Sequence, residues 1–212
     1  IKKSGFNAKK VSKKQIKFKN KNFKFFIEPH IEQGPVLEKK KIPLGIVTGI
    51  RGSFRFRDAF CKGEYLHSGA TPYDYRKDSV VAVSNLVNEM NTFWKAQLKK
   101  NKDLVITFGQ FFTDNEEHSF AKSSGLVNFC IDVRSNSKKT LEYTKKILIK
   151  KIKLIEKKTN TKFFLGKETN SEPAFVKNCT LASPAIALAK IVLPFPGGPT
   201  SSTPFGILPP SL

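Results

Sequence analysis

One short segment gathers several side chains that could do chemistry around a Gly-Pro turn. It runs from His30 to Glu38 and reads His-Ile-Glu-Gln-Gly-Pro-Val-Leu-Glu, so it holds a histidine, two carboxylates and a carboxamide. A neutral imidazole is the commonest protein ligand for zinc-type metals, but a catalytic zinc takes about three protein ligands. Taken alone, His30 is better explained as a surface or half-buried histidine at the end of a strand.

Two later segments also carry polar groups at a turn or a strand end. Residues 67–72 read His-Ser-Gly-Ala-Thr-Pro, which predicts a turn, and residues 129–134 read as a strand that ends on a guanidinium. A guanidinium suits a carboxylate, because its planar fork can donate two parallel hydrogen bonds. Simpler roles stay open for both segments. His67 could order a tight turn, and Arg134 could pair with Asp132 or with a carboxylate on a helix.

Together, the three segments closely resemble one group of bacterial amidohydrolases. The match consists of His30-Ile-Glu-Gln-Gly-Pro with Gly45-Ile-Val-Thr-Gly-Ile after it, the turn at 67–72 with Arg76-Lys-Asp after it, and Asp132-Val-Arg. The group is the hydantoinase/carbamoylase branch of the M20-type metallohydrolases. It includes N-carbamoyl-L-amino-acid hydrolase, allantoate amidohydrolase and β-ureidopropionase.

The resemblance implies metal-assisted hydrolysis of a non-peptide C–N bond, with two divalent ions, zinc or manganese, that activate a water molecule. His30 resembles the family's metal ligand, and Gln33 resembles a neighbouring substrate contact. His67 resembles the catalytic histidine that reaches into the partner subunit's active site to steady the substrate or the oxyanion. Arg134 resembles the guanidinium that grips the substrate carboxylate. His118 stands close to the place of a substrate-binding asparagine and is a further candidate for substrate binding.

The resemblance also predicts that the metal site is incomplete in this chain. The family's other ligands and its paired-glutamate general base lie mostly before the segment that contains His30, and a last histidine lies after the satellite domain. Here a lysine-rich lead without acidic residues precedes Glu28, and no histidine follows His118. We therefore expect a truncated or degraded relative that is inactive on its own.

The charge of the chain raises a different class of function, nucleic-acid binding. The formal net charge is +21, residues 1–24 hold ten lysines and no acid, and residues 137–158 are again lysine-rich. Such a surface can neutralise phosphates, and Phe54-Arg-Phe-Arg57 faintly repeats the aromatic-basic alternation of single-strand binders. Arginine is scarce, however, and the lysines at 137–158 fall between apolar residues at helical spacing, which is typical of a solvated helix face. We expect a small-molecule partner and not a nucleic acid.

Cysteine spacing and hydropathy indicate the compartment. Cys61, Cys130 and Cys179 are far apart and form no CxxC pair, so they read as reduced thiols. The sequence shows no signal peptide and no apolar run long enough to span a bilayer. We expect a cytoplasmic protein without a membrane partner.

Hydrophobic periodicity predicts an α/β (α+β) fold with a ferredoxin-like centre. Strands are predicted at 46–64, 104–112, 125–133 and 161–165, and amphipathic helices at 78–99 and 137–158. This β-α-β-β-α-β order is that of a split βαβ sandwich, a four-stranded antiparallel sheet with two helices on one face. The family's satellite, or dimerisation, domain has the same fold.

The chain therefore divides into five predicted segments. They are a basic, poorly ordered lead at 1–24, a remnant of the catalytic domain with the His30 motif at 25–45, the satellite domain at 46–168, a return helix within 169–192, clearest at 183–192, and an irregular tail at 193–212. Satellite domains of this kind pair across a two-fold axis. We expect a homodimer, and the chain could also be a dimerisation module without catalysis.

Overall fold

The computed structural model describes residues 25–175 and 187–193 of the chain. They fall into two compact units. A central unit consists of Gly49–Phe175, and a terminal unit combines the described parts of Ile1–Thr48 and Val176–Leu212. The lead predicted at 1–24 and all but the first residue of the tail predicted at 193–212 lie outside the described residues.

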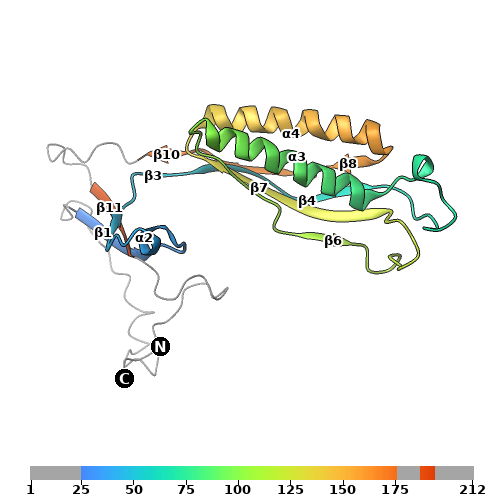
Figure 1. The fold of residues 1–212 in the computed structure, drawn as a ribbon. Coiled ribbons are helices and arrows are strands. Elements are labelled where there is room, and N and C mark those ends of the chain that lie inside the picture. The colour runs from blue at the N-terminus through green and yellow to red at the C-terminus, as the bar shows by residue number, and fades with distance from the viewer. Residues whose placement is uncertain (1–24, 176–186, 194–212) are drawn as a thin grey trace, which may run out of the picture. The chain divides into compact units, whose positions relative to one another are not determined.

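An antiparallel sheet forms one layer of the central unit (Figure 1). Its strands lie in the order β5 (Val105–Thr107), β7 (Leu126–Ser135), β4 (Gly52–Lys62) and β8 (Lys162–Phe164), and neighbours are antiparallel. The short strand β6 (Phe111–Thr113) also pairs with β7, and β9 (Glu168–Ser171) also pairs with β4. A separate ladder joins β3 (Gly49–Ile50) to β10 (Ala174–Phe175).

Both long helices cover the same face of this sheet, as Figure 1 shows. Helix α3 (Ser79–Lys99) begins at Asp78, whose carboxylate accepts hydrogen bonds from two backbone N–H groups of the first turn. Helix α4 (Lys138–Thr159) begins at Ser137, whose hydroxyl accepts one such bond. Short polar side chains of this kind favour helix starts. If β5 and β6 are counted as one strand, β4, α3, β5/β6, β7, α4 and β8 follow the predicted β-α-β-β-α-β order, and both helices lie where the sequence predicts them.

The hydrophobic core lies between the sheet and the two helices. Alternate residues of β7 are buried on the helix side, and the largest side chains of the core are Phe54, Phe56, Leu86, Met90, Leu104, Phe129, Ile131 and Leu148. Phe54 and Phe56 are only 3% and 4% exposed. They cannot stack on bases from there, so the aromatic-basic surface suggested by residues 54–57 is absent.

Two further expectations concern cysteines and membrane spans. Cys61 and Cys130 are free thiols, as expected, and burial raises the pKa of Cys61 to about 11. Cys179 lies outside the described residues. Within the described ranges, no helix is long and apolar enough to cross a bilayer.

The single strand predicted at 104–112 is instead two short strands on one partner. Thr107 lies opposite Asp132, and Phe111 lies opposite Phe129. Four steps along this segment therefore match three steps along β7, and the extra residue interrupts the ladder as a β-bulge does. Gly109 and Gln110 lie at the interruption, and a glycine within a strand pattern often marks a bulge, a signal that the prediction of one strand did not use.

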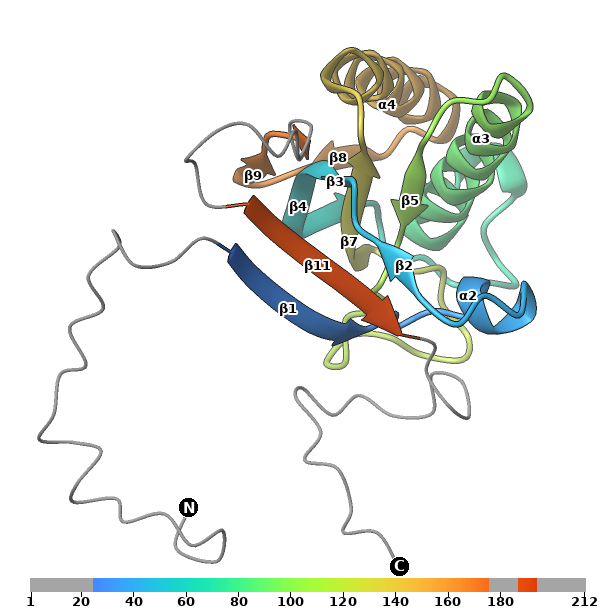
Figure 2. The ribbon, with the colours of Figure 1, turned by 90° about the vertical axis from the view of Figure 1, so that its left-hand side faces the viewer.

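The terminal unit shows that the predicted return helix is wrong. Its strand β11 (Ala187–Leu193) lies between β1 (Phe25–Ile31) and β2 (Gly45–Ile46), parallel to the first and antiparallel to the second (Figure 2). Residues 183–186 lie outside the described residues, and β9 and β10 occupy the start of the predicted segment. Alanines in β11 favour a helix, but Ile191 and Val192 favour a strand, and pairing along the whole of β1 decides the outcome.

Candidate functional site

His67 lies in the turn region that follows β4, and the turn itself orients the imidazole. Its Nδ1 accepts hydrogen bonds from the backbone N–H groups of Gly69 and Ala70, both at 3.1 Å. A ring nitrogen that accepts carries no proton, so the neutral ring has its proton on Nε2. The side chain is exposed. Its Nε2–H is therefore a donor available to a bound molecule.

The loop between β6 and β7 supports this turn through the backbone. Ser68 N–H donates to the carbonyl of Ala121 at 2.8 Å. Arg76 supports the turn from within, because its guanidinium donates to the carbonyls of Ser68 and Thr71. His67 thus orders a tight turn, as its simpler interpretation predicts, and the same bonds fix its Nε2–H as a donor.

His118 stands on the loop that supports the His67 turn. Its Nδ1 lies 3.0 Å from Thr113 Oγ1, and the side chain is exposed. An open hollow beside it is lined by Asp78, Thr113, His118, Lys122, Ser123 and Ser124, among others. Lys122 also forms an isolated β-bridge with His67. The structure therefore brings both histidines to one end of the central unit.

Arg134 lies near the other end of the sheet, in a cluster of three charged residues. Its Nε and one terminal nitrogen donate to Asp132 Oδ2 at 2.8 and 2.5 Å, and Arg55 Nε donates to Asp132 Oδ1 at 3.0 Å. Burial alone would raise the pKa of Asp132, but the hydrogen bonds and charges of Arg134 and Arg55 outweigh it and lower that pKa. The pairing of Arg134 with Asp132, which the sequence left open, is present.

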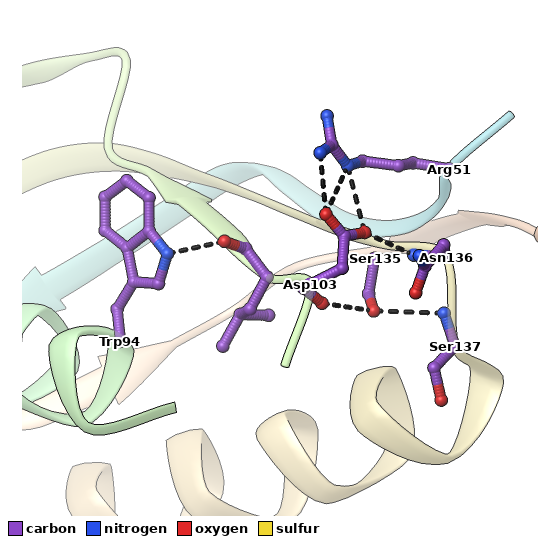
Figure 3. A network of polar contacts seen from close by, with 7 residues as sticks. Arg51, Trp94, Asp103, Ser135, Asn136 and Ser137 are labelled. Carbon is purple, nitrogen blue, oxygen red and sulfur yellow. Dashed lines mark hydrogen bonds and ion pairs between the residues drawn. The ribbon is translucent and has the colours of Figure 1, made fainter. Parts of the chain in front are cut away.

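A second polar network joins three chain segments at Ser135 and Asn136, next to Arg134 in the sequence (Figure 3). Arg51 Nε donates to both carboxylate oxygens of Asp103, at 2.9 and 3.0 Å, and the backbone N–H of Asn136 donates to one of them at 2.7 Å. The Ser135 hydroxyl donates to the Asp103 carbonyl at 2.6 Å. Hydrogen bonding from Arg51 lowers the pKa of Asp103. The network connects the start of β4, the turn before β5 and the end of β7.

The structure does not bring Arg134 and the two histidines together. Arg134 lies opposite Ser53 at the start of β4, whereas Leu126, at the other end of β7, lies opposite Lys62 at the end of β4. The eight steps along β7 from Leu126 to Arg134 span about 26 Å at about 3.3 Å per step of strand. We call these the arginine end and the histidine end of the sheet. One small molecule cannot touch both ends of one chain.

In the terminal unit, His30 has the opposite tautomer. Its Nδ1 lies 2.5 Å from the carbonyl oxygen of Ile31. A carbonyl can only accept, so Nδ1 carries the proton and Nε2 keeps its lone pair. A histidine that binds a metal usually donates its other ring N–H in this way. The ring of His30 is therefore in a form that suits a metal ligand.

The neighbouring polar residues have separate structural roles. The Glu32 carboxylate accepts hydrogen bonds from the backbone N–H groups of Val36 and Leu37, at 3.1 and 2.9 Å. It thereby satisfies the start of the short helix α2 (Val36–Lys39). Gln33 adopts a positive φ of 56° and its side chain is exposed. Of the first motif, His30 and Gln33 stay candidates for binding, while Glu32 is used within the fold.

The described residues hold one candidate metal ligand, His30, and do not form a complete metal site. Every aspartate, glutamate and histidine of the chain lies between Glu28 and Glu172. Among the described residues, no group of three His, Cys, Asp or Glu side chains is placed to hold an ion. A catalytic zinc takes about three protein ligands. His30 fits such a site, but its partners are not found within the described ranges.

Known proteins similar to this chain point to one group. No protein-family model matches the chain. It is 32% identical over 155 residues to the N-carbamoyl-L-amino-acid amidohydrolase of Pseudomonas sp. (strain NS671), a match that covers 72% of this chain and 36% of that protein. It is 31% identical over 142 residues to a probable allantoate deiminase of Oryza sativa, covering 60% of this chain and 28% of that protein. A crystal structure of a hydantoinase/carbamoylase family amidase from Burkholderia multivorans has a TM-score of 0.68 at 21% identity, over 79% of this chain and 46% of that one.

The chain is homologous to the hydantoinase/carbamoylase amidohydrolases. Its curated relatives act on C–N bonds, which confirms the family predicted from the sequence. The chain spans about a third of the length of the two curated relatives named, 28% and 36%. Its mixed α/β architecture with an antiparallel sheet is shared with the solved amidases.

For this amidohydrolase relative, sequence reasoning missed Arg55. The alternation of residues 54–57 already placed Arg55 on the opposite face of its strand from Phe54 and Phe56. Its position beside Asp132 depends on the register between β4 and β7. A single sequence does not give that register, because a slip of one residue would move every side chain to the other face.

Proposed function

We propose that this chain is part of a metal-dependent amidohydrolase that cleaves a non-peptide C–N bond in a small carboxylate-bearing substrate. N-carbamoyl amino acids and allantoate are the candidate substrates, since the relatives are named for them. The observation that carries the proposal is the tautomer of His67, which presents an exposed Nε2–H donor. Such a donor stabilises the oxyanion that forms when water adds to a carbonyl carbon.

The central unit is proposed to be a ferredoxin-like satellite domain. Its element order, the strand order β5-β7-β4-β8 and the placement of both helices on one face support this assignment. The described part of the terminal unit is proposed to belong to a catalytic domain. The parallel pairing of β1 with β11 supports that, because parallel pairs are typical of α/β domains. The reduced thiols are consistent with a cytoplasmic enzyme.

The distance between the two ends of the sheet favours a homodimer. About 26 Å separates Leu126 from Arg134 along β7, so His67 and Arg134 contact the same small substrate only if they come from two copies of the chain. A two-fold axis would then build two equivalent sites, each with the histidine end of one chain and the arginine end of the other. The dimer is thus part of the proposed function.

Each candidate residue has a stated task in this proposal. Bound divalent ions would supply the activated water, with His30 as one of their ligands through Nε2. Arg134 donates to the substrate carboxylate, and Gln33 and His118 contact its other polar groups. His67 donates from Nε2 to the carbonyl oxygen as that oxygen gains negative charge. His67 does not have to release its proton for this task.

We propose further that the 212 residues do not catalyse the reaction by themselves. Within residues 25–175 and 187–193, His30 is the one candidate ligand of suitable form, whereas about three protein ligands are needed for a catalytic zinc. The purified chain is tested with N-carbamoyl amino acids and with allantoate, with zinc or manganese added and a chelator as control. No hydrolysis is expected. Turnover that disappears with the chelator would show that the site is complete in this chain.

A chimera tests the assigned roles directly. Residues 49–175 replace the corresponding segment of the Pseudomonas enzyme, and hydrolysis of N-carbamoyl amino acids is expected to persist. His67→Ala should then lower kcat by about 100-fold or more, the usual cost of one oxyanion donor. Arg134→Gln should mainly raise KM, since it removes a carboxylate contact. Arg57→Gln, an exposed arginine on β4, is the matched control. Equal kinetics for all three variants would contradict the proposal.

A further inference from the structure

Arg55 and Arg134 share a single carboxylate on the face of the sheet opposite the helices. Arg55 on β4 lies directly opposite Asp132 on β7, and Arg134 stands two residues further along β7. Side chains two apart on a strand share a face. The side chain of Asp132 is 24% exposed, while those of Arg55 and Arg134 are 31% and 51% exposed. The three form a partly buried cluster that solvent or a ligand can reach.

The cluster carries an excess positive charge that its neighbours do not neutralise. Two guanidinium groups meet one carboxylate, and the lowered pKa of Asp132 keeps that carboxylate ionised. The residues directly opposite the cluster on adjacent strands are Ser53, Val105, Thr107 and Thr169. None of them is acidic. The group therefore has a net charge of about one positive unit on this face.

The two arginines use Asp132 differently. Arg134 donates to Oδ2 of Asp132 from its Nε and from one terminal nitrogen. Arg55 donates to Oδ1 from its Nε only. Among the described residues, neither guanidinium makes another hydrogen bond. Asp132 thus fixes the plane of Arg134 and leaves one of its terminal nitrogens unused. Arg55 binds the remaining oxygen of Asp132 and offsets its charge.

We propose that Arg55 is a positioning residue for the carboxylate site of Arg134. Arg55 neutralises the charge of Asp132. Asp132 can therefore hold Arg134 in place, while Arg134 still attracts the carboxylate of a bound substrate. The inference rests on the proposed function, in which Arg134 binds the substrate carboxylate. Without Arg55, the pair of Asp132 and Arg134 has no net charge. The carboxylate of a substrate would then be repelled by the carboxylate of Asp132.

The proposal differs from a structural ion pair in one consequence. If Arg55 only stabilised the sheet, its loss would weaken folding, and a further loss of Asp132 could not improve binding. If Arg55 offsets the charge of Asp132, replacing both residues restores the positive charge of Arg134. The double variant should then bind a carboxylate better than the variant of Arg55 alone.

The test is an NMR titration of the full 212-residue chain with N-carbamoylglycine, observed at the Nε–Hε resonance of Arg134. The uncharged amide of N-carbamoylglycine controls for contacts other than charge, and inorganic phosphate shows whether the site selects carboxylates. For the native chain, a saturable shift with N-carbamoylglycine and none with the amide is expected. Arg55→Gln should raise the dissociation constant about tenfold, in line with the loss of one charge-assisted contribution. Arg57→Gln should leave it unchanged.

The double variant Arg55→Gln/Asp132→Asn decides between the two roles. Recovery of most of the lost affinity supports the proposal, and so does partial recovery in Arg55→Lys, which keeps the charge. Native affinity in Arg55→Gln would overturn the inference and leave the role of Arg134 standing. No response of Arg134 in the native chain would overturn the carboxylate role itself. The dispersion of backbone amide signals reports the folding of each variant. If Arg55→Gln does not fold, the affinity of the double variant, which has no unpaired carboxylate at position 132, is compared with that of the native chain.

Discussion

The two ends of the central sheet are fixed by different interactions. At the histidine end, backbone hydrogen bonds join the chain segments. Gly63 N–H donates to the carbonyl of Gly125 at 2.7 Å, and Glu64 N–H donates to the carbonyl of Lys77 at 2.8 Å. At the arginine end, ion pairs join Arg51 to Asp103 and Arg55 and Arg134 to Asp132. The first kind of bond does not titrate, whereas the second depends on ionised carboxylates.

This difference matches what each end is proposed to do. A donor to an oxyanion has to be held at a fixed place, and a frame of backbone bonds with a defined tautomer provides that. A site that binds a carboxylate needs a positively charged side chain, and a partly buried positive charge needs a carboxylate partner to be stable in the folded protein. The histidine end thus provides a donor at a fixed position, and the arginine end provides positive charge. Three substitutions test this contrast.

The largest effect is expected from Gly63→Ala at the histidine end. A Cβ on Gly63 would lie 2.0 Å from the backbone carbonyl oxygen of Lys77. That carbonyl already accepts the Glu64 N–H, so it cannot move aside without breaking the frame. We expect the free energy of unfolding, measured with urea, to fall by about 3 kcal/mol.

Gly69→Ala is the matched control for that substitution. A Cβ there would meet the ring of His67 at 3.5 Å, an ordinary contact. Its effect should stay below about 0.5 kcal/mol, as for other exposed positions. If both alanines cost the same, close backbone contact is not what holds the histidine end.

The same contrast separates what the sequence predicts from what it does not. The two helices and the turn of His67 follow from local patterns and were predicted. The strand β11 was missed, because a distant partner, β1, overrides an alanine-rich helical preference. The cluster around Asp132 was half predicted. Its Asp-Val-Arg half is local in sequence, whereas Arg55 arrives through cross-strand register.

A smaller effect, and a dependence on pH, is expected from Asp103→Asn at the arginine end. The substitution removes the charge that pairs with Arg51 and that accepts the Asn136 N–H. Arg51 is half exposed, so we expect a loss of about 1–2 kcal/mol at neutral pH. The lowered pKa of Asp103 means that its contribution is present above the unfolded value of 3.8 and is lost as the pH falls through the native value.

The measurement for Asp103→Asn is urea unfolding of both chains from neutral pH to about pH 2. The gap in stability between native chain and variant should begin to narrow as the pH falls below the unfolded value of 3.8. It should close only below the lowered native pKa of Asp103, where the native carboxyl is protonated too. Glu64→Gln, which loses the exposed pair with Lys77 at the histidine end, should change stability by less than about 0.5 kcal/mol. A gap that stays constant down to pH 2 would mean that ionisation does not fix the arginine end.

The smallest energetic effect is expected from His67→Ala, and it tests the geometry of the histidine end most directly. The variant loses an acceptor for two exposed N–H groups that water can replace, so stability should fall by no more than about 1 kcal/mol. The sharper observation is the tautomer, which nitrogen-15 NMR reports when the ring is neutral. We expect the proton on Nε2 of His67 and on Nδ1 of His30, the latter because that nitrogen faces a carbonyl oxygen. A proton on Nδ1 of His67 would mean that the turn does not orient this ring. The frame at the histidine end would then present an acceptor, and a histidine that accepts cannot stabilise an oxyanion.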